Sequence, residues 1–408
     1  MGLVRLFQVS DLHLGCPFGW LSSEQRDRRR RDQRQALERS VQEAIERGAH
    51  AILLPGDLFD KIGVDADTLA FALEAFQVSG CPPVFIAPGN HDPYFPRSLC
   101  WNDALLAARG RQWPEHVRRF TTEQWTAFDL PEVDHVRVWG RCFVSQAVSP
   151  ERPLSAASVA DVPPADGSRL ELALFHGSRE GYCPYGTDVT GPFSDAEALA
   201  SPFTYLAAGH YHTHSAITST QGLAAGARLA YAGSAVALGM TETGIHGALD
   251  VRIEFGRRLP FIETELVRLD PRQVHSIPVD LTRCGTAEQV DRRIEKALDD
   301  AAVAAEDLVS VRLTGRLAKD VRYQPSPRLK ERVFHLDMNA KELRRDYDVE
   351  SVRDRQPATT EDRFVRAMLE RMDAERDPAR KAALERALYY GLDALTLGEV
   401  VPAHEDLE

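Results

Sequence analysis

The sequence of 408 residues lacks several features that would assign it to a specialised class of protein. It contains no run of about 18 apolar residues, the length that a membrane-spanning helix needs. Its six cysteines, at positions 16, 81, 100, 142, 183 and 284, include no CxxC pair, so neither a disulfide framework nor a zinc knuckle is expected. The N-terminus enters an apolar run directly and shows no signal-peptide pattern. These absences favour a cytoplasmic protein with reduced thiols and no membrane contact.

The sequence also has no excess of positive charge. Its 61 acidic and 49 basic side chains give a net charge of −12 at pH 7. This charge excludes a surface that is basic throughout, but it allows a local basic patch or bound cations. The densest basic run is Arg26–Arg34, which holds six arginines and two aspartates. Two interpretations stay open for this run: a solvated helix face with local ion pairs, or phosphate contacts beside an active site through Arg28, Arg30 and Arg31.

What the sequence does contain is a series of five short apolar runs, each followed by polar residues. The runs are Leu3–Ser10, Ala51–Leu54, Val84–Ala87, Leu170–Phe175 and Phe203–Ala208. Apolar runs of about four to eight residues that end in turn residues are typical of buried strands. The first three runs alternate with amphipathic helices, which predicts a parallel sheet with right-handed crossovers. Because the carboxyl ends of such strands meet at one edge of a sheet, the polar residues are expected to form one site.

The five polar segments carry oxygen and imidazole donors and no thiolate. They are Asp11-Leu12-His13, Gly56-Asp57-Leu58-Phe59-Asp60, Gly89-Asn90-His91-Asp92, Phe175-His176-Gly177 and Gly209-His210-Tyr211-His212-Thr213-His214. This donor set suits manganese, iron or zinc. Asp11 and His13 are two positions apart on an extended segment, so their side chains point the same way. One such histidine alone is most often a structural residue, but five segments together indicate a metal site in which Asp57 is the natural carboxylate to bridge two ions.

These segments resemble the calcineurin-like metallophosphoesterase superfamily, whose pattern is D-x-H, G-D, G-N-H-[DE], H and G-H-x-H. All five parts occur in this order across residues 11–212. Within the superfamily, Asp11-Leu12-His13-Leu14-Gly15 and Gly56-Asp57-Leu58-Phe59-Asp60 resemble the DNA-repair exonucleases of the SbcD type. Those enzymes are bacterial relatives of the meiotic-recombination-eleven nuclease. The Glu242-Thr243-Gly244 stretch and the small domain after it are similar to the YhaO-like branch.

The resemblance implies a centre of two divalent ions, with manganese expected and iron or zinc as alternatives. The first ion takes Asp11, His13, Asp57 and His212, and the second takes Asp57, Asn90, His176 and His210. His91 lies near the scissile phosphate and protonates or stabilises the leaving oxygen. Asp60 stands where archaeal and eukaryotic members carry a second catalytic histidine, and its carboxylate is expected to orient His91. His214 lies outside the shared pattern, and Asp92 either orients His91 or caps a turn.

The chain divides into three predicted parts. Residues 1–270 form an α/β metallophosphoesterase domain, expected to be a two-sheet sandwich flanked by helices. Residues 271–320 form a small β-α-β unit that resembles a capping domain guiding DNA to the metals. Residues 321–408 hold a polar linker and two amphipathic helices, predicted over 360–374 and 378–395. By the resemblance this helical hairpin docks on the coiled coil of an SbcC-like (Rad-fifty-type) ATPase, and the alternative is that it packs on its own chain.

Three functions stay open. The first is metal-dependent hydrolysis of DNA by an exonuclease or endonuclease subunit, with DNA and an SbcC-like ATPase as partners and a homodimer allowed. The second is a phosphodiesterase or phosphatase that acts on a small phosphoester. The third is a non-catalytic partner of a coiled-coil ATPase. The intact set of ligands favours an enzyme over the third function, and the additional domains favour DNA over a small substrate.

Overall fold

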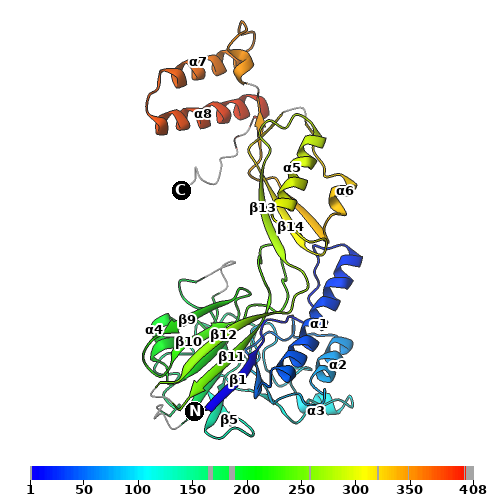
Figure 1. Cartoon of the computed structure of the whole chain (residues 1–408), viewed down its shortest axis with the longest axis vertical. Coiled ribbons are helices and arrows are strands. Elements are labelled where there is room, and N and C mark those ends of the chain that lie inside the picture. Colours follow the sequence, from blue (N-terminus) through cyan, green and yellow to red (C-terminus); the bar gives the residue numbers. More distant parts are fainter. Residues whose placement is uncertain are drawn as a thin grey trace. The chain divides into compact units, whose positions relative to one another are not determined.

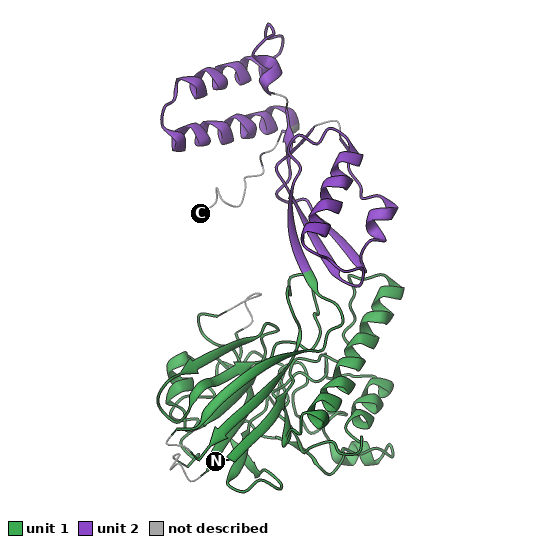
Figure 2. Cartoon of the chain, viewed as in Figure 1, with its two compact units in different colours: residues 1–274 green, residues 275–408 purple. Residues whose placement is uncertain are grey.

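The computed structural model describes residues 2–163, 169–182, 189–256, 259–318, 321–347, 349–398 and 400. The chain forms two compact units, Met1–Val274 and His275–Glu408 (Figure 2). Five cysteines are free thiols, as predicted, and Cys183 lies outside the described residues. Among the helices described, none has the length and apolar character to span a membrane.

Unit 1 is built around one large sheet with the strand order β4-β3-β2-β1-β11-β12-β10-β8-β7-β6-β5, in which β9 also pairs with β10. The strands are β1 (Gly2–Gln8), β2 (Ala51–Leu54), β3 (Val84–Ile86), β4 (Val117–Arg119), β5 (Thr126–Asp129), β6 (Val136–Gly140), β7 (Leu170–His176), β8 (Tyr205–Gly209), β9 (Ser215–Ser219), β10 (Ala225–Tyr231), β11 (Gly247–Phe255) and β12 (Phe261–Arg268). The series β1 to β4 pairs in parallel, and so do β6, β7, β8 and β10. The strand β11 links the two series because it pairs antiparallel with both β1 and β12.

The sheet curls so that its two halves face each other across a shared core. Successive residues of a strand point to opposite faces. Leu53 of β2 therefore packs with Leu172 of β7 in the shared core. Its neighbour Ile52 packs on the other face, in the same cluster as Leu37 of α1 (Ser23–Glu46). These contacts confirm the predicted α/β sandwich and show that its two layers are halves of one continuous sheet.

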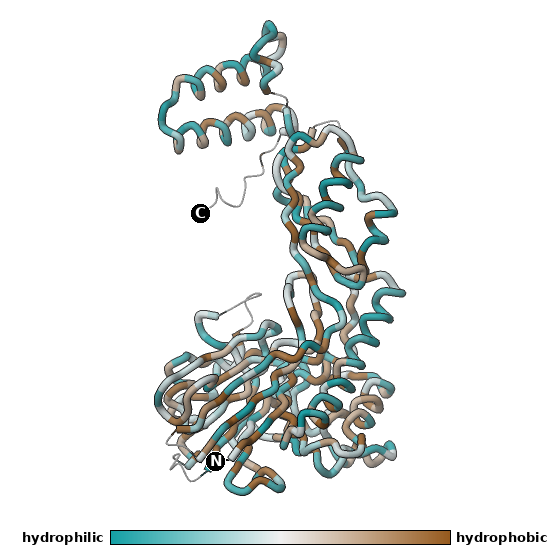
Figure 3. Tube along the Cα trace, viewed as in Figure 1, coloured by the Kyte–Doolittle hydropathy of each residue, from teal (hydrophilic) through white to brown (hydrophobic). Residues whose placement is uncertain are grey.

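In the part of unit 1 that the structure describes, four helices accompany the sheet. They are α1 (Ser23–Glu46), α2 (Ala66–Ala75), α3 (Asp103–Ala107) and α4 (Asp195–Ala200). In Figure 1, α1, α2 and α3 lie together beside β1, whereas α4 lies beside β9 and β10. Helix α1 begins with a capping box formed by Ser22 and Gln25, which satisfies its first main-chain N–H groups. Figure 3 shows apolar residues gathered in the strands, while the N-terminal part of α1 is largely hydrophilic.

A buried group of charges joins the start of α1 to the segment after β12. Arg29 is fully buried and donates two hydrogen bonds to the carboxylate of Asp270, one of them 2.7 Å long. Asp32 accepts from Arg29 at 3.3 Å and from Arg272 at 2.7 Å. Burial alone would lower the pKa of Arg29, but the charge of Asp270 outweighs it, and the pKa is raised. The basic run is therefore not one exposed face, because the helical period places Arg29, Asp32 and Gln33 on its buried side.

Unit 2 contains small sheets and a helical hairpin. Its elements are β13 (Val274–Asp280), α5 (Ala287–Asp300), β14 (Leu308–Thr314), β15 (Arg316–Ala318), α6 (Pro327–Lys330), β16 (His335–Asn339), β17 (Arg344–Asp346), the 3-10 helix η1 (Val349–Val352), α7 (Thr360–Ala374) and α8 (Pro378–Leu397). The sheet has the order β13-β14-β16, and β15 pairs with β17. Because β16 lies beyond residue 320, this sheet extends past the predicted boundary between cap and linker. The polar, proline-containing sequence there gave no periodicity from which these short elements could be predicted.

The two helices predicted over 360–374 and 378–395 are present as α7 and α8. Val365, Met368 and Leu369 of α7 pack with Leu388 and Leu392 of α8 in a cluster of buried side chains. The apolar stripes of the two helices therefore cover each other. This packing corresponds to the alternative in which the hairpin packs on its own chain.

Candidate metal centre

The five predicted segments meet at one edge of the large sheet of unit 1. Each follows the carboxyl end of β1, β2, β3, β7 or β8, where parallel strands deliver their ligands. One candidate ligand atom from each of Asp11, Asp57 and His176 lies within 4.8 Å of the other two. Asp11, His13 and His212 form a second group that meets the same distance limit. The structure therefore brings residues from four separate loops into these two overlapping groups, and His13, Asp60 and His91 form a third group within the same distance limit.

The backbone at this edge is strained. Four of the predicted ligands have positive φ angles: Asp11 (49°), His13 (46°), Asp57 (51°) and His210 (116°). Residues other than glycine rarely adopt such angles, and each costs about 1–3 kcal/mol. Main-chain hydrogen bonds hold the strained loops together, since the amide of Asp11 donates to Gly56 at 3.2 Å and that of His13 donates to Asp57 at 2.9 Å. Such strain persists only where the surroundings fix the backbone, and its concentration here is typical of a functional site.

Two glycines allow these loops to approach one another closely. A Cβ atom on Gly89 would lie 2.2 Å from Oδ1 of Asp57. A Cβ atom on Gly209 would lie 1.9 Å from the carbonyl oxygen of Pro55. Any side chain at either position would therefore push the loop that carries Asp57 away from its neighbours.

Asp57 lies between histidines of the two ligand groups. Its Oδ2 atom is 3.6 Å from Nε2 of His13 and 3.3 Å from Nε2 of His176. Its Oδ1 atom accepts a hydrogen bond of 3.0 Å from the main-chain N–H of His91. Burial raises the pKa of Asp57, but His176 and His13 outweigh this effect and hold the pKa well below its usual range. Asp57 is therefore held as an ionised carboxylate between a histidine of each group.

The two histidines His176 and His212 are oriented by hydrogen bonds to their Nδ1 atoms. Nδ1 of His176 donates to the carbonyl of Pro55 at 3.0 Å, and Nδ1 of His212 donates to the carboxylate of Glu242 at 2.9 Å. A carbonyl or carboxylate oxygen can only accept, so each Nδ1 carries a proton and each Nε2 stays available to a metal. Burial lowers the pKa of both rings, but Asp57 raises that of His176 to about 9 and Glu242 raises that of His212 to about 9.

His91 lies at the exposed side of the site. Its Nδ1 atom donates to the main-chain carbonyl of Asp60 at 2.9 Å, and its ring centroid is 4.6 Å from that of His13. The carboxylate of Asp60 lies 3.5 Å from Nδ1 of His13. It is also within 4.8 Å of a ring nitrogen of His91, so Asp60 approaches the His91 ring with both its carbonyl and its carboxylate.

The remaining predicted residues lie around these groups. The main-chain N–H of His210 donates to the carboxylate of Asp11 at 3.1 Å. The ring centroid of His210 is 5.2 Å from that of His176. The ring of His214 is held elsewhere, since its Nδ1 donates to the carbonyl of Tyr231 at 2.9 Å. The ligand groups found among the described residues do not include the ring of His210 or that of His214.

Asp92 fastens the loop that carries His91. Its carboxylate accepts from the main-chain N–H of Gly89 at 2.8 Å and from that of Phe59 at 3.1 Å. Burial and the nearby charge of Asp57 raise the pKa of Asp92 to about 7. Of the two roles considered from the sequence, capping the turn is the one for which the structure supplies contacts.

The residues at this edge fit divalent cations. Several buried polar atoms of the described residues have no hydrogen-bond partner, and three of them are candidate metal ligands at this edge: Nε2 of His13, Nε2 of His176 and Oδ1 of Asn90. Buried polar atoms are nearly always paired, and the buried carboxylates of Asp11 and Asp57 need positive charge beside them. Cations bound by imidazole nitrogen and carboxylate or amide oxygen would satisfy all of these groups at once.

Glu242 is a site residue that sequence reasoning did not assign. It is buried, and besides His212 it accepts from the main-chain N–H of Leu238 at 2.8 Å. It stands 30 positions after His212, in the Glu242-Thr243-Gly244 stretch that is similar to the YhaO-like branch. No local spacing signals this contact, because it depends on how the chain returns after β10.

The three arginines predicted to contact DNA have different surroundings. Arg28 is exposed and pairs with Glu24 at 2.8 Å. Arg30 and Arg31 line a cavity of about 420 Å³ beside the metal centre, and Arg28 does not. Lys61 lines the same cavity, and it was missed although it directly follows Asp60 in the sequence.

Comparison with known proteins gives one family. The model of the family described as calcineurin-like phosphoesterase matches residues 4–213, which is half of the chain. No curated protein matches the sequence. Similar solved structures include the protein TT1561 of Thermus thermophilus, with 15% identity, a TM-score of 0.36 and coverage of 65% of this chain and 100% of that chain. A dimetal phosphatase from Danio rerio shares 12% identity, with a TM-score of 0.36 and coverage of 64% and 98%. GAP50 from Plasmodium shares 11% identity, with a TM-score of 0.37 and coverage of 66% and 86%.

Proposed function

The chain belongs to the calcineurin-like phosphoesterase family, and we propose that within this family it is a metal-dependent DNA nuclease. Hydrolysis of phosphoesters at a dinuclear metal centre is the chemistry of the family. One observation carries the choice of DNA: His91 is exposed, while the ligands Asp57 and His176 behind it are buried. Sites for small ligands enclose most of the ligand surface, whereas an open edge accepts a strand that continues on both sides.

The proposed ligands follow the two groups at the sheet edge. The first ion takes Asp11, His13, Asp57 and His212, and the second takes Asp57, Asn90, His176 and His210. Manganese is the proposed ion, and iron or zinc would accept the same donors. When bound, two divalent ions supply an activated water molecule and neutralise the charge that develops on the phosphate oxygens.

The chain's own contribution to the reaction is assigned to His91. Because its Nδ1–H is held by the carbonyl of Asp60, a second proton can only sit on Nε2. The main-chain N–H of His91 is also fixed by Asp57, so the ring is placed relative to the proposed bridging carboxylate. We assign Nε2 to donate a proton or a hydrogen bond to the leaving oxygen of the scissile phosphate.

We also propose that unit 2 guides DNA and that its α7–α8 hairpin contacts an SbcC-like (Rad-fifty-type) coiled-coil ATPase. The resemblance of the motifs to SbcD-type nucleases supports this proposal. Since the apolar stripes of the hairpin cover each other, the partner would meet its outward faces. Light scattering of the protein mixed with the SbcC-like ATPase from the same genome tests the contact. A mass equal to that of the separate proteins would count against it, and a doubled mass of the protein alone would identify a homodimer.

The experiment that tests the DNA proposal compares two substrates under the same conditions. The purified chain, with Mn²⁺, is given end-labelled duplex and single-stranded DNA beside bis(p-nitrophenyl) phosphate, with Asp57→Asn as the inactive control. Cleavage of DNA and of the chromogenic diester, both lost in the control, is the expected result. Hydrolysis of the diester without cleavage of DNA would favour the small-phosphoester function. Inactivity on both substrates would favour the non-catalytic partner.

A further inference from the structure

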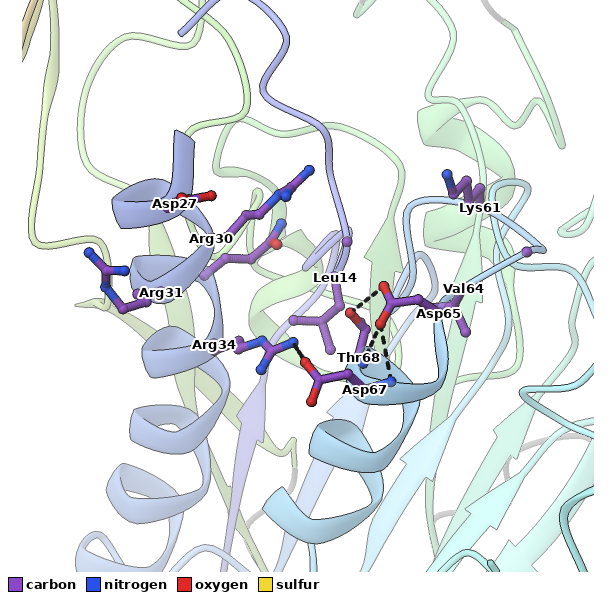
Figure 4. A pocket seen from close by; sticks show the side chains of 13 residues that line it. Leu14, Asp27, Arg30, Arg31, Arg34, Lys61, Val64, Asp65, Asp67 and Thr68 are labelled. Atoms are coloured by element: carbon purple, nitrogen blue, oxygen red, sulfur yellow. Dashed lines mark hydrogen bonds and ion pairs between the residues drawn. The ribbon is translucent and has the colours of Figure 1, made fainter. Parts of the chain in front are cut away.

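A second concave site lies beside the metal centre. It is a cavity of about 420 Å³, within the range of roughly 300–1,000 Å³ that is common for ligand sites. Its wall begins at Leu14 and Gly15, directly after the proposed ligand His13, and includes Lys61, directly after Asp60. The rest of the wall comes from α1, from residues 63–65 and from the first turn of α2 (Figure 4). We call this cavity the α1 pocket.

The acidic side chains of the α1 pocket are largely occupied. Four cations and three carboxylates line it: Arg30, Arg31, Arg34, Lys61, Asp27, Asp65 and Asp67. Asp67 pairs with Arg34 at 2.5 Å. Asp65 caps α2 and accepts from the main-chain N–H of Thr68 at 2.8 Å. Of the carboxylates in the wall, Asp27 alone is not already engaged by Arg34 or by the cap of α2. The wall holds four cations and three carboxylates, so the pocket has an excess of positive charge although the net charge of the chain is −12.

The surplus cations are available to a ligand. Among the described residues, Arg30 donates only to a main-chain carbonyl, that of Cys16, at 3.3 Å. Lys61 is exposed and forms no ion pair or hydrogen bond with any residue that the structure describes. Figure 4 shows Arg30 on α1 and Lys61 on the opposite side of the segment that carries Leu14. Two cations that face one opening and lack carboxylate partners are suited to an anion.

The composition of the α1 pocket also restricts the kind of anion contact. Its described wall contains no aromatic side chain, so it offers no platform on which a base could stack. Arginine and lysine that meet phosphate oxygens position a strand without reading its sequence. The pocket therefore suits the backbone of a nucleic acid rather than its bases.

We infer that the α1 pocket binds the phosphate next to the scissile one in a nucleic-acid strand, through Arg30 and Lys61. This inference rests on the proposed nuclease function and adds to it a subsite that distinguishes a strand from an isolated phosphodiester. It assigns the neighbouring phosphate to the side of the centre where His13 and Asp60 lie. A strand with phosphates on both sides of the cleaved bond gains this contact, whereas bis(p-nitrophenyl) phosphate has no second phosphate to offer.

The test uses Arg30→Gln, Lys61→Gln and the double variant, with Arg28→Gln as the matched control. Arg28 is on the same helix and has the same side chain, but it lies outside the pocket and pairs with Glu24. The quantity measured is kcat/KM for a short single-stranded oligonucleotide divided by kcat/KM for bis(p-nitrophenyl) phosphate. This ratio is expected to fall about fivefold for each replaced pocket residue, through a higher KM for the oligonucleotide, and to keep its wild-type value in the control.

Binding provides a second readout that a merely structural role would not change. In an Asp57→Asn background, where cleavage does not interfere, the salt slope of oligonucleotide binding is expected to decrease by roughly 0.7 for each pocket residue replaced. The inference is overturned if the pocket variants change the ratio and the slope no more than Arg28→Gln does, or if they impair both substrates equally. In that case cleavage of DNA by the wild type would still uphold the nuclease function. A wild type that hydrolyses the diester and no oligonucleotide would instead overturn both.

Discussion

Two parts of the site in unit 1 are built in opposite ways. The candidate ligand set, Asp11, His13, Asp57 and His176, is at most 3% exposed, lies on strained or tightly packed backbone and is held by several loops. The open face, His91, Arg30 and Lys61, is exposed and held by few contacts. The candidate ligands are thus fixed together with the fold, whereas the residues proposed to contact the substrate can change without disturbing it.

The largest effect is expected when the central carboxylate of the candidate ligands is removed. In Asp57→Asn the charge between His13 and His176 is lost, so we expect at most one bound ion. Hydrolysis of every phosphoester should fall by at least about 10³-fold, because both the activated water and the charge neutralisation depend on the centre. Elemental analysis after equilibration with Mn²⁺ and the chromogenic assay measure the two effects. Asp129→Asn, at an exposed carboxylate on β5, is the control. Two fully bound ions in Asp57→Asn would refute the bridging assignment.

A substitution on the open face should separate chemistry from metal binding. His91→Asn is expected to keep both ions, because His91 is not assigned as a ligand. Its kcat should fall by roughly 10²–10⁴-fold on DNA and on the chromogenic diester alike, since help to the leaving oxygen is lost. His214→Asn, which removes a nearby ring bound to the carbonyl of Tyr231, should have little effect. Turnover in His91→Asn equal to that of the wild type would move the catalytic role to another residue.

A smaller effect is expected behind the ligand set, at Glu242. Glu242→Gln weakens the acceptor that orients His212 and favours its Nε2 as a ligand. Loss of such a supporting group typically weakens metal binding by about 10–100-fold, so activity should return when the Mn²⁺ concentration is raised. Titration calorimetry gives the affinity, and a thermal melt of the metal-free variant checks its folding. An affinity equal to that of the wild type would show that the contact with His212 has no role in binding the ion.

The last effect in this series is a dependence of metal affinity on pH, expected from a change of one pH unit at a time. The pKa values of His176 and His212 are raised to about 9, so both rings are protonated near pH 7 before an ion binds. An imidazole must lose that proton to become a ligand, so protons compete with the metal and affinity rises with pH. We expect about a tenfold rise per pH unit for each ion between about pH 6 and 8. Calorimetry in buffers of different ionisation enthalpy should report one proton released per ion, and a heat independent of the buffer would contradict the assignment.

The ligand set was largely accessible from the sequence because its signals are local. Asp11 and Asp57 each follow a short apolar run, and parallel strands deliver the residues after them to one edge of the sheet. The helical hairpin was predictable for the same reason, since the periodicity of α7 and α8 lies within each helix. The order of strands and helices alone was enough to predict that Asp11 and Asp57 lie at the same edge of the sheet.

The contacts that could not be predicted depend on where the chain returns after long excursions. The pairing of Gly2 with Phe255 places β11 between β1 and β12, and no local pattern specifies it. Glu242 reaches His212 only through the turn that follows β10. The carboxylate of Asp60 lies beside His13 and its carbonyl beside His91. This arrangement depends on the backbone conformation of the loop, so the residue type alone could not predict it.

The buried pair of Arg29 and Asp270 has a consequence for how this gene tolerates variation. Arg29 and Arg30 are adjacent and have the same side chain, but Arg29 is buried and Arg30 is exposed, so their substitutions are expected to have different effects. Replacing Arg29 leaves Asp270 as an unpaired buried charge, which destabilises a protein by about 3–5 kcal/mol, so a library of variants screened only for folded protein loses substitutions at this position. Arg30 is exposed, so its substitutions are expected to pass that screen, and under its proposed role they would lower only the activity on a nucleic-acid strand. A screen for folding and a screen for DNA cleavage would therefore exclude substitutions at two different, adjacent residues of α1.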